Sequence, residues 1–367
     1  MAVTVLAAVV VAGCRTVAPP DPARVAALAP ELGELLLVGF EGTTGEGNAE
    51  LERLLCETRV GGVLLFARNV VDADQVAALT RWIHERGRTC TGRGPLVAID
   101  AEGGSVMRLS PVAGYAPTLS ADELGQANDV TLTELEGRRI GALLRSAGVD
   151  WNLAPVVDVG LNPANPVIVG VGRSFSADPV MVTEHARAFV RGLRDGGVLT
   201  TLKHFPGHGS SFGDTHHGFV DVTDTANLDA ELYPYRALIA ERLADSIMTA
   251  HVFNRTLDRR DPATLSRPTI AGLLRGQLGY DGAVVSDDLR MGAIEQHYGL
   301  GDAARRAITA GVDVLLIAQD RLPDDRSAAA VALAALREAL AGGCLPPGRL
   351  VDALARVRDL RTRAGLP

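Results

Sequence analysis

The chain has 367 residues, of which 47% are hydrophobic and 22% charged, and its formal net charge is −8. This is the composition of a soluble globular protein, long enough for one large barrel or two modest domains. It excludes a disordered chain, a collagen-like fibre and a polytopic membrane protein, and the acidic balance disfavours a nucleic-acid partner. Of the 36 cationic side chains, only Lys203 is a lysine, and all the others are arginines.

The N-terminus resembles a lipoprotein signal. An apolar run over residues 3–12 leads into Val11-Ala12-Gly13-Cys14, although the positive charges that usually precede such a run are missing. We therefore predict a signal peptide over residues 1–13 and lipidation of Cys14, with an apolar tail as the alternative. The proline-rich residues that follow predict a tether over 14–30, ahead of a domain over 31–367. Acyl chains on Cys14 would hold the protein on the outer face of a bacterial cytoplasmic membrane.

Three further cysteines, Cys56, Cys90 and Cys344, lie in the expected domain. An exported protein can form disulfides, and Cys56 and Cys90 can meet because each shortly precedes a predicted strand. The sequence alone leaves the pairing open. No cysteine or histidine spacing indicates zinc.

The rest of the chain alternates short β-branched runs with longer amphipathic stretches. The expected strands cover residues 35–40, 62–66, 96–100, 149–153, 199–204, 246–251, 283–287 and 314–318. The clearest helical patterns cover residues 49–58, 73–86, 131–147, 180–194 and 228–242. Apolar strands separated by helices predict a parallel sheet, and eight such units favour an α/β fold of the (β/α)8 barrel type. An open doubly wound sheet is the alternative, weakened by the lack of an early GxGxxG turn.

Polar residues lie where five of these strands end. They are Glu41, Asp100 with Glu102, Lys203 with His204, His251, and Asp287 with Asp288. The carboxyl ends of parallel barrel strands share one face, where such enzymes carry their active sites. Buried carboxylates and imidazoles cost stability unless they are paired or functional, so this pattern predicts an enzyme site.

Residues 203–217 hold four of the eight histidines. One interpretation is a metal site built from His204, His208, Asp214 and His216 or His217, but the i,i+4 helical spacing of a zincin is absent and the glycines and proline indicate a loop. A second is a purely structural loop. The third, which we favour, pairs Asp214 with His216, because a carboxylate that orients an imidazole suits general acid/base chemistry near neutral pH.

The second chemical segment is Ser286-Asp287-Asp288-Leu289. A carboxylate at a strand end can act as a nucleophile toward an anomeric carbon, whereas an aspartate before a helix can simply be an N-cap. We assign Asp287 to the site and Asp288 to the start of the following helix.

Together these segments resemble glycoside hydrolase family 3, in its single-domain β-N-acetylglucosaminidase branch. The resemblance is carried by Lys203-His204-Phe205-Pro206-Gly207-His208-Gly209 and Asp214-Thr215-His216. It also involves residues 61–69, 99–104 with Arg108, 152–158, 172–175, 248–251 and 286–289, all in family order. The segments around 169–171 and 210–212 match only loosely.

The resemblance implies a retaining exo-glycosidase that removes non-reducing terminal GlcNAc, with peptidoglycan (GlcNAc-MurNAc) fragments as the expected substrate. Asp287 would be the nucleophile, and His216, assisted by Asp214, the acid/base. The expected substrate-binding residues are Asp100, Arg108, Arg173, Lys203, His204, Asn152, His251 and Met291. No metal or other cofactor is implied. The expected partners are the glycan and, through the lipid anchor alone, a membrane; we expect a monomer.

Three alternatives remain open: a phosphorylase on the same scaffold, a substrate-assisted mechanism, and a non-catalytic lipid-anchored sugar-binding protein. That position 203 is a lysine in a chain whose other cations are all arginines favours a sugar-binding role for Lys203. A compact ammonium can direct three donors at sugar hydroxyls, and a planar guanidinium would change that geometry.

Overall fold

The computed structural model describes residues 20–366. The predicted signal peptide and Cys14 lie outside these residues. Between residues 20 and 366, none of the helices combines the length and apolar character needed to cross a bilayer.

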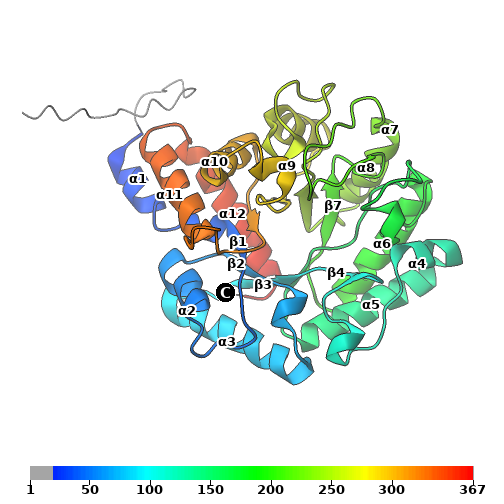
Figure 1. The fold of residues 1–367 in the computed structure, drawn as a ribbon, viewed down its shortest axis with the longest axis horizontal. Coiled ribbons are helices and arrows are strands. Elements are labelled where there is room, and N and C mark those ends of the chain that lie inside the picture. The colour runs from blue at the N-terminus through cyan, green and yellow to red at the C-terminus, as the bar shows by residue number, and fades with distance from the viewer. Residues whose placement is uncertain (1–19, 367) are drawn as a thin grey trace, which may run out of the picture.

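Eight parallel strands form the centre of the molecule (Figure 1). One sheet has the order β10-β1-β2-β3-β6 and the other β7-β8-β9. Single parallel bridges, Trp151 with Leu199 and Val285 with Val314, join the two sheets, so the strands follow one another in a closed ring. The strands are β1 (Leu36–Gly39), β2 (Gly62–Leu65), β3 (Leu96–Ile99), β6 (Trp151–Asn152), β7 (Thr201–Phe205), β8 (Ser246–Thr249), β9 (Ala283–Ser286) and β10 (Leu315–Ile317). All eight predicted strands and the barrel class are thereby confirmed.

Helices surround these strands (Figure 1). They are α1 (Pro22–Leu28), α2 (Ala49–Glu52), α3 (Ala73–Thr91), α4 (Ala121–Ala127), α5 (Val130–Ser146), α6 (Pro179–Asp195), α7 (Leu228–Glu231), α8 (Tyr233–Ala240), α9 (Gly292–Glu295), α10 (Leu300–Ala310), α11 (Ala328–Ala341) and α12 (Pro347–Arg363). Side-chain hydrogen bonds cap the first turns of several helices. At the start of α3, for example, the Asp72 carboxylate accepts the backbone N–H of Gln75. Every strand residue of β1, β2, β3 and β9 is buried, which explains their continuous apolar sequences.

Two predicted helices are interrupted. Residues 49–58 form α2 and then the π-helix η2 (Arg53–Thr58). Residues 228–242 form α7 and α8, and Pro234 lies in the first turn of α8. Proline has no N–H for a continuing helix, so a new helix begins around it.

The tether prediction is wrong for its second half. Pro22 begins α1, and the Asp21 side chain caps this helix by accepting from the N–H of Ala23 at 3.0 Å. α1 packs against α11 and α12, and Leu28 belongs to the core. An aspartate followed by proline is a helix start, and the apolar face behind it gives the helix a packing partner.

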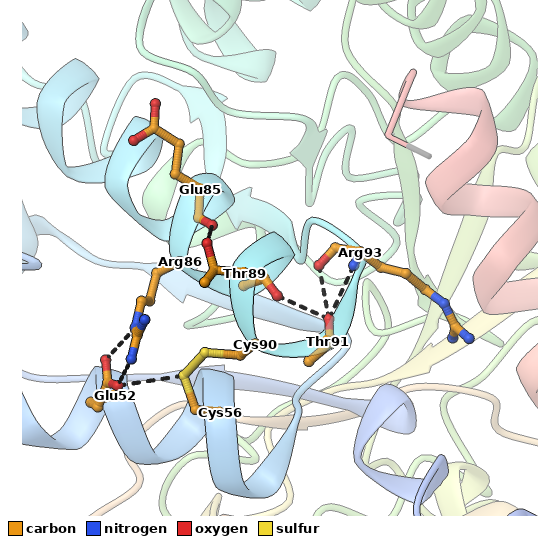
Figure 2. Close-up of a disulfide and its surroundings, with 9 residues drawn as sticks. Glu52, Cys56, Glu85, Arg86, Thr89, Cys90, Thr91 and Arg93 are labelled. Atoms are coloured by element: carbon orange, nitrogen blue, oxygen red, sulfur yellow. Dashed lines mark hydrogen bonds and ion pairs between the residues drawn. A yellow bond between two sulfur atoms is a disulfide. The ribbon is translucent and has the colours of Figure 1, made fainter.

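Two features were not predicted or were left open. The strands β4 (Ala101–Gly103) and β5 (Val106–Met107) form an antiparallel hairpin directly after β3. Cys56 in η2 and Cys90 in α3 form a disulfide with Cα atoms 5.0 Å apart (Figure 2). Beside it, Arg86 pairs with Glu52 (Figure 2). Cys344 packs against the core between α11 and α12.

Candidate active site

A cavity of about 300 Å³ lies at the carboxyl ends of the strands. Its apolar lining consists of Leu64, Phe66, Val106, Leu153, Met248, Met291, Leu316 and Ala318. Its polar lining consists of Asp100, Glu102, Arg108, Arg173, Lys203, His204, His216, Asp287 and Asp288. Residues from three of the five polar strand ends, far apart in the chain, therefore meet in one cavity, as the barrel requires.

Asp287 follows β9 and lines this cavity. One of its carboxylate oxygens accepts the N–H of Asp288 at 2.8 Å. Burial opposes its ionisation, but His251, His204 and the Asp288 N–H outweigh it, so the pKa of Asp287 lies below its usual value. Asp287 is consequently an anion at neutral pH, as a nucleophile must be.

Asp288 has a different environment. Its Oδ1 accepts from the N–H of Arg290 at 3.1 Å and from that of Ala318 at 3.0 Å. The residue that precedes α9 is Met291, so Asp288 caps the turn before the helix and not the helix itself. Burial and the charge of Asp287 raise the pKa of Asp288 to about 6. The two adjacent aspartates thus have opposite pKa shifts.

Asp214 and His216 form the predicted dyad. His216 Nδ1 lies 2.6 Å from Asp214 Oδ1, and the same oxygen accepts the backbone N–H of His216 at 2.9 Å. Burial works against ionisation of Asp214, but these hydrogen bonds and the His216 charge keep its pKa below the usual value. The carboxylate therefore selects the Nδ1–H form of the ring, which makes Nε2 the nitrogen that exchanges a proton. His216 lines the cavity, whereas Asp214 lies behind it.

The loop that carries the dyad docks on the start of α9. The carbonyl of His216 accepts from Gly292 N at 3.1 Å, and that of Thr215 from Ala293 N at 3.0 Å. Since α9 follows shortly after Asp287 and Asp288, this docking ties the loop of the Asp214–His216 dyad to the segment that carries Asp287.

Lys203 is buried in the wall of the same cavity. Its Nζ lies 2.8 Å from Asp100 Oδ1 and 2.6 Å from Glu102 Oε1. Burial lowers the pKa of Lys203, but the two carboxylates more than compensate, and the net shift is upward. Two of its three donors are thus occupied by protein, which leaves one for a sugar hydroxyl and corrects the expectation of three.

Glu102, which the sequence analysis placed at a polar strand end but did not name as a substrate-binding residue, also anchors Arg173. Arg173 donates two hydrogen bonds to the Glu102 carboxylate, at 2.7 and 2.8 Å. Arg173 and Lys203 hold the pKa of Glu102 well below its usual range despite burial. One sequence feature could have predicted this role for Glu102. Asp100 and Glu102 are two residues apart in an extended segment, and side chains at that spacing lie on the same face.

Arg108 lies beside Asp100, with 3.7 Å between Nη2 and Oδ2. Its guanidinium also approaches the face of Phe66, 5.9 Å from the ring centre. Arg108 therefore completes the charged wall that Asp100, Glu102, Arg173 and Lys203 form.

Asp158 is a second residue that the sequence analysis did not assign to the site. It is fully buried and accepts from His204 Nδ1 at 2.7 Å and from the backbone N–H of His208 at 2.8 Å. His204 Nε2 lies 3.3 Å from Arg173 Nη2, so Nε2 accepts and Nδ1 donates. A lone aspartate inside the apolar segment 156–159 was the signal for this role.

Asn152 and His251 do not line the cavity. Asn152 holds Ala101 through both its amide groups, at 3.0 and 2.9 Å. His251 Nε2 donates to the carbonyl of Asp288 at 2.8 Å, and its Nδ1 lies 2.8 Å from Thr264 Oγ1. His251 therefore fixes the backbone of Asp288, which lines the cavity, and Asn152 fixes that of Ala101, which lies between the lining residues Asp100 and Glu102.

The loop histidines do not converge as metal ligands. His208 lies 2.7 Å from Ser211 Oγ and 3.2 Å from Thr215 Oγ1 through its two ring nitrogens. The ring nitrogens of His204 face Asp158 and Arg173. Within residues 20–366, the one group of ligand atoms close enough for a metal is Glu52, Cys56 and Cys90, and its cysteines form the disulfide.

An eight-stranded parallel barrel whose mouth combines an ionised aspartate, a histidine–aspartate dyad and a charged wall is typical of a glycoside hydrolase. Residues 27–360 match the model of the glycosyl hydrolase family 3 N-terminal domain. The chain belongs to glycoside hydrolase family 3.

Similar proteins agree with this assignment. The chain is 39% identical to a β-hexosaminidase of Alkalilimnicola ehrlichii over 77% of its length and 80% of that protein. It is 35% identical to the β-hexosaminidase LpqI of Mycobacterium tuberculosis over 93% of its length and 85% of that protein.

Solved structures give the same result. A family 3 β-N-acetylglucosaminidase from Paenibacillus sp. is 37% identical, with a TM-score of 0.86 over 92% of this chain and 62% of that one. A β-N-acetylhexosaminidase from Beutenbergia cavernae is 32% identical, with a TM-score of 0.81 over 92% and 98%.

Proposed function

We propose that this protein is a retaining exo-β-N-acetylglucosaminidase that removes terminal GlcNAc from short glycans. The observation that carries the proposal is that Asp287, His216 and Lys203 line the same cavity. The family membership and the hexosaminidase relatives support this activity.

The proposed chemistry has two steps. In the first, an Asp287 oxygen forms a bond to the anomeric carbon while the glycosidic bond breaks, and His216 Nε2 transfers its proton to the departing oxygen. In the second, His216 removes a proton from water as the water oxygen attacks the anomeric carbon and Asp287 departs. Asp214 keeps Nδ1 protonated in both steps.

The charged wall supports recognition of the sugar. Asp100 and Glu102 retain acceptor capacity beyond Lys203, and Arg108, Arg173 and Lys203 supply donors. Because Asp100 and Lys203 bond to each other first, they are preorganised for adjacent hydroxyls and lose little conformational freedom when substrate binds. The small cavity favours one sugar ring at a chain end over a long polymer.

A fluorinated GlcNAc analogue with a good leaving group tests the covalent step. Mass spectrometry should find the label on Asp287 in the intact enzyme and no label in Asp287→Ala, which should also lose hydrolysis of an aryl β-GlcNAc glycoside. Turnover without any labelled residue would instead support attack by the acetamido oxygen. Binding without turnover would identify a sugar-binding protein.

A separate experiment tests whether water or phosphate accepts the sugar. The enzyme should release GlcNAc from a GlcNAc-MurNAc fragment equally well in phosphate and in phosphate-free buffer. GlcNAc-1-phosphate as the main product in phosphate would identify a phosphorylase. Failure on the GlcNAc-MurNAc fragment, with activity on other β-GlcNAc glycosides, would contradict the peptidoglycan assignment alone.

We also propose that the protein acts as a monomer, lipid-anchored through Cys14 on the outer face of the cytoplasmic membrane. The sequence Val11-Ala12-Gly13-Cys14 supports the anchor. Mass spectrometry of the N-terminal peptide should find acyl chains on Cys14, and Cys14→Ala should release the protein from the membrane fraction. Light scattering of the detergent-solubilised protein should give the mass of one chain.

A further inference from the structure

Glu231 is a buried acid that the proposed chemistry does not use. It is the last residue of α7, and only 1% of its surface is exposed. Its Oε1 accepts from Ser210 Oγ at 2.9 Å and from Ser210 N at 3.3 Å. A Cβ atom at Gly207 would lie 2.7 Å from the Glu231 side chain, so the two residues are in close contact. Glu231 therefore supports the first turn of the loop that ends in the dyad.

A continuous series of contacts leads from that turn to His216. Ser211 Oγ lies 2.7 Å from His208 Nδ1, and His208 Nε2 lies 3.2 Å from Thr215 Oγ1. Thr215 precedes His216 and is docked on α9 through its carbonyl. The segment 207–215 is thus one hydrogen-bonded unit, held by Glu231 at its start and by α9 at its end.

The groups that face Glu231 come from three elements besides its own. They are Ser210 of the loop, Asp158 of the segment after β6, and Tyr235 of α8. Burial and, to a smaller extent, the negative charge of Asp158 raise the pKa of Glu231 to about 7, although Ser210 acts in the opposite direction. The carboxyl group is therefore largely protonated below neutral pH and about half ionised near pH 7.

We propose that Glu231 is a positioning residue for the acid/base loop: its buried carboxyl group fixes Ser210 and Gly207, and its loss displaces His216 while the sugar-binding wall stays in place. The expected effect on catalysis rests on the proposed acid/base role of His216. The wall is independent of Glu231 because Lys203, Asp100 and Glu102 bond to one another on other elements. Above about pH 7 the ionised carboxylate must be accommodated beside Asp158, which loosens the same turn.

Hydrogen exchange measures the positioning directly and does not depend on activity. Amides of residues 207–217 should exchange faster in Glu231→Ala than in the wild type, while Glu231→Gln, which imitates the neutral carboxyl, should retain most of the protection. Raising the pH from 6 to 8 should reduce protection in the wild type, after correction for intrinsic exchange, more than in Glu231→Gln. Equal protection in all three proteins would overturn the proposal.

Leaving-group dependence measures the consequence for catalysis. For an aryl β-GlcNAc glycoside with a poor leaving group, kcat/KM of Glu231→Ala should fall on the order of 10²-fold, the cost of misplacing a catalytic group. With a highly acidic phenol, which departs without a proton, the loss should be much smaller, and KM should change little. An equal loss with both substrates would indicate general damage and overturn the proposal.

Two further variants control for folding. Ser210→Ala removes the hydroxyl from the other side of the same contact and should change activity in the same direction, by less. Asp229→Ala, on the same helix with an exposed side chain, should match the wild type. If the wild type itself hydrolyses no β-GlcNAc glycoside, the proposed function fails, and hydrogen exchange still decides whether Glu231 positions the loop.

Discussion

Lys203 Nζ and Asp100 Oδ1 lie 2.8 Å apart in the wall of the cavity, although 102 residues separate them in the chain. With Glu102 on the other side of Nζ, the ammonium lies between two carboxylates and is almost completely buried. The single lysine of the sequence thus occupies a position where a compact charge is required. A planar guanidinium would have to contact both carboxylates from a longer side chain.

The first prediction concerns this lysine. Lys203→Arg should keep the fold, because the positive charge remains, but kcat/KM for a β-GlcNAc glycoside should fall about 10²-fold since Asp100 and Glu102 are displaced. Circular dichroism and steady-state kinetics measure the two effects. Arg138→Lys, at a half-exposed position, serves as control. Near-wild-type activity of Lys203→Arg would show that this position does not require a lysine.

The second prediction concerns the dyad. Asp214→Asn retains the shape of the carboxylate but removes the charge that stabilises protonated His216, so kcat/KM should fall about 10²- to 10⁴-fold. The loss should be greatest for poor leaving groups. Steady-state kinetics with a series of aryl glycosides measures how kcat/KM depends on the acidity of the leaving group. Asp224→Asn, at an exposed position, serves as the control and should behave like the wild type. A uniform loss across the series would contradict the acid/base role.

The third prediction uses Asp288. Its pKa is raised to about 6 in the folded protein, so the folded state binds an extra proton relative to the unfolded state between about pH 4 and 6. This contribution to stability is present at low pH and is lost as the pH rises through 6. Asp288→Asn lacks it. The free energy of unfolding of the variant relative to the wild type should therefore increase by about 1 kcal/mol from pH 5 to pH 7.5.

Urea unfolding of both proteins at the two pH values measures this difference. A relative stability that stays constant with pH would show that Asp288 is ionised throughout. Activity is not the readout here, since Asp288 lies next to Asp287, the proposed nucleophile.

The fourth prediction concerns the disulfide between Cys56 and Cys90. Replacing both cysteines by alanine should lower the free energy of unfolding by about 2–4 kcal/mol, because the unfolded chain regains the freedom of the closed loop. Activity should persist, since Cys90 lies near the end of α3, ahead of β3, at the opposite end of the barrel from the cavity. Denaturant unfolding with and without a reductant measures the effect. A reductant should destabilise the wild type more than the double variant, because only the wild type has the Cys56–Cys90 bond to lose.

Much of the fold could be predicted because its signals are local. Each barrel strand is a short apolar run buried on both faces, and Asp100, Lys203 and Asp287 stand at or just after the ends of such runs. The helix boundaries were less accurate because Pro234 and the π-helix η2 interrupt regular apolar spacing. The start of the domain was misplaced because α1 looks like a proline-rich linker until its buried face is known.

The sequence by itself determined the barrel class, the parallel strands, the dyad of Asp214 with His216 and the candidacy of Asp287, since these depend on residue type and short spacing. The tertiary structure alone decided which polar groups neutralise one another. It placed Glu102 between Lys203 and Arg173, buried Asp158 beneath His204, and moved Asn152 and His251 behind the cavity wall. The reason is physical: a buried charge is stable only with a partner, and in a barrel that partner comes from a strand far away in the chain.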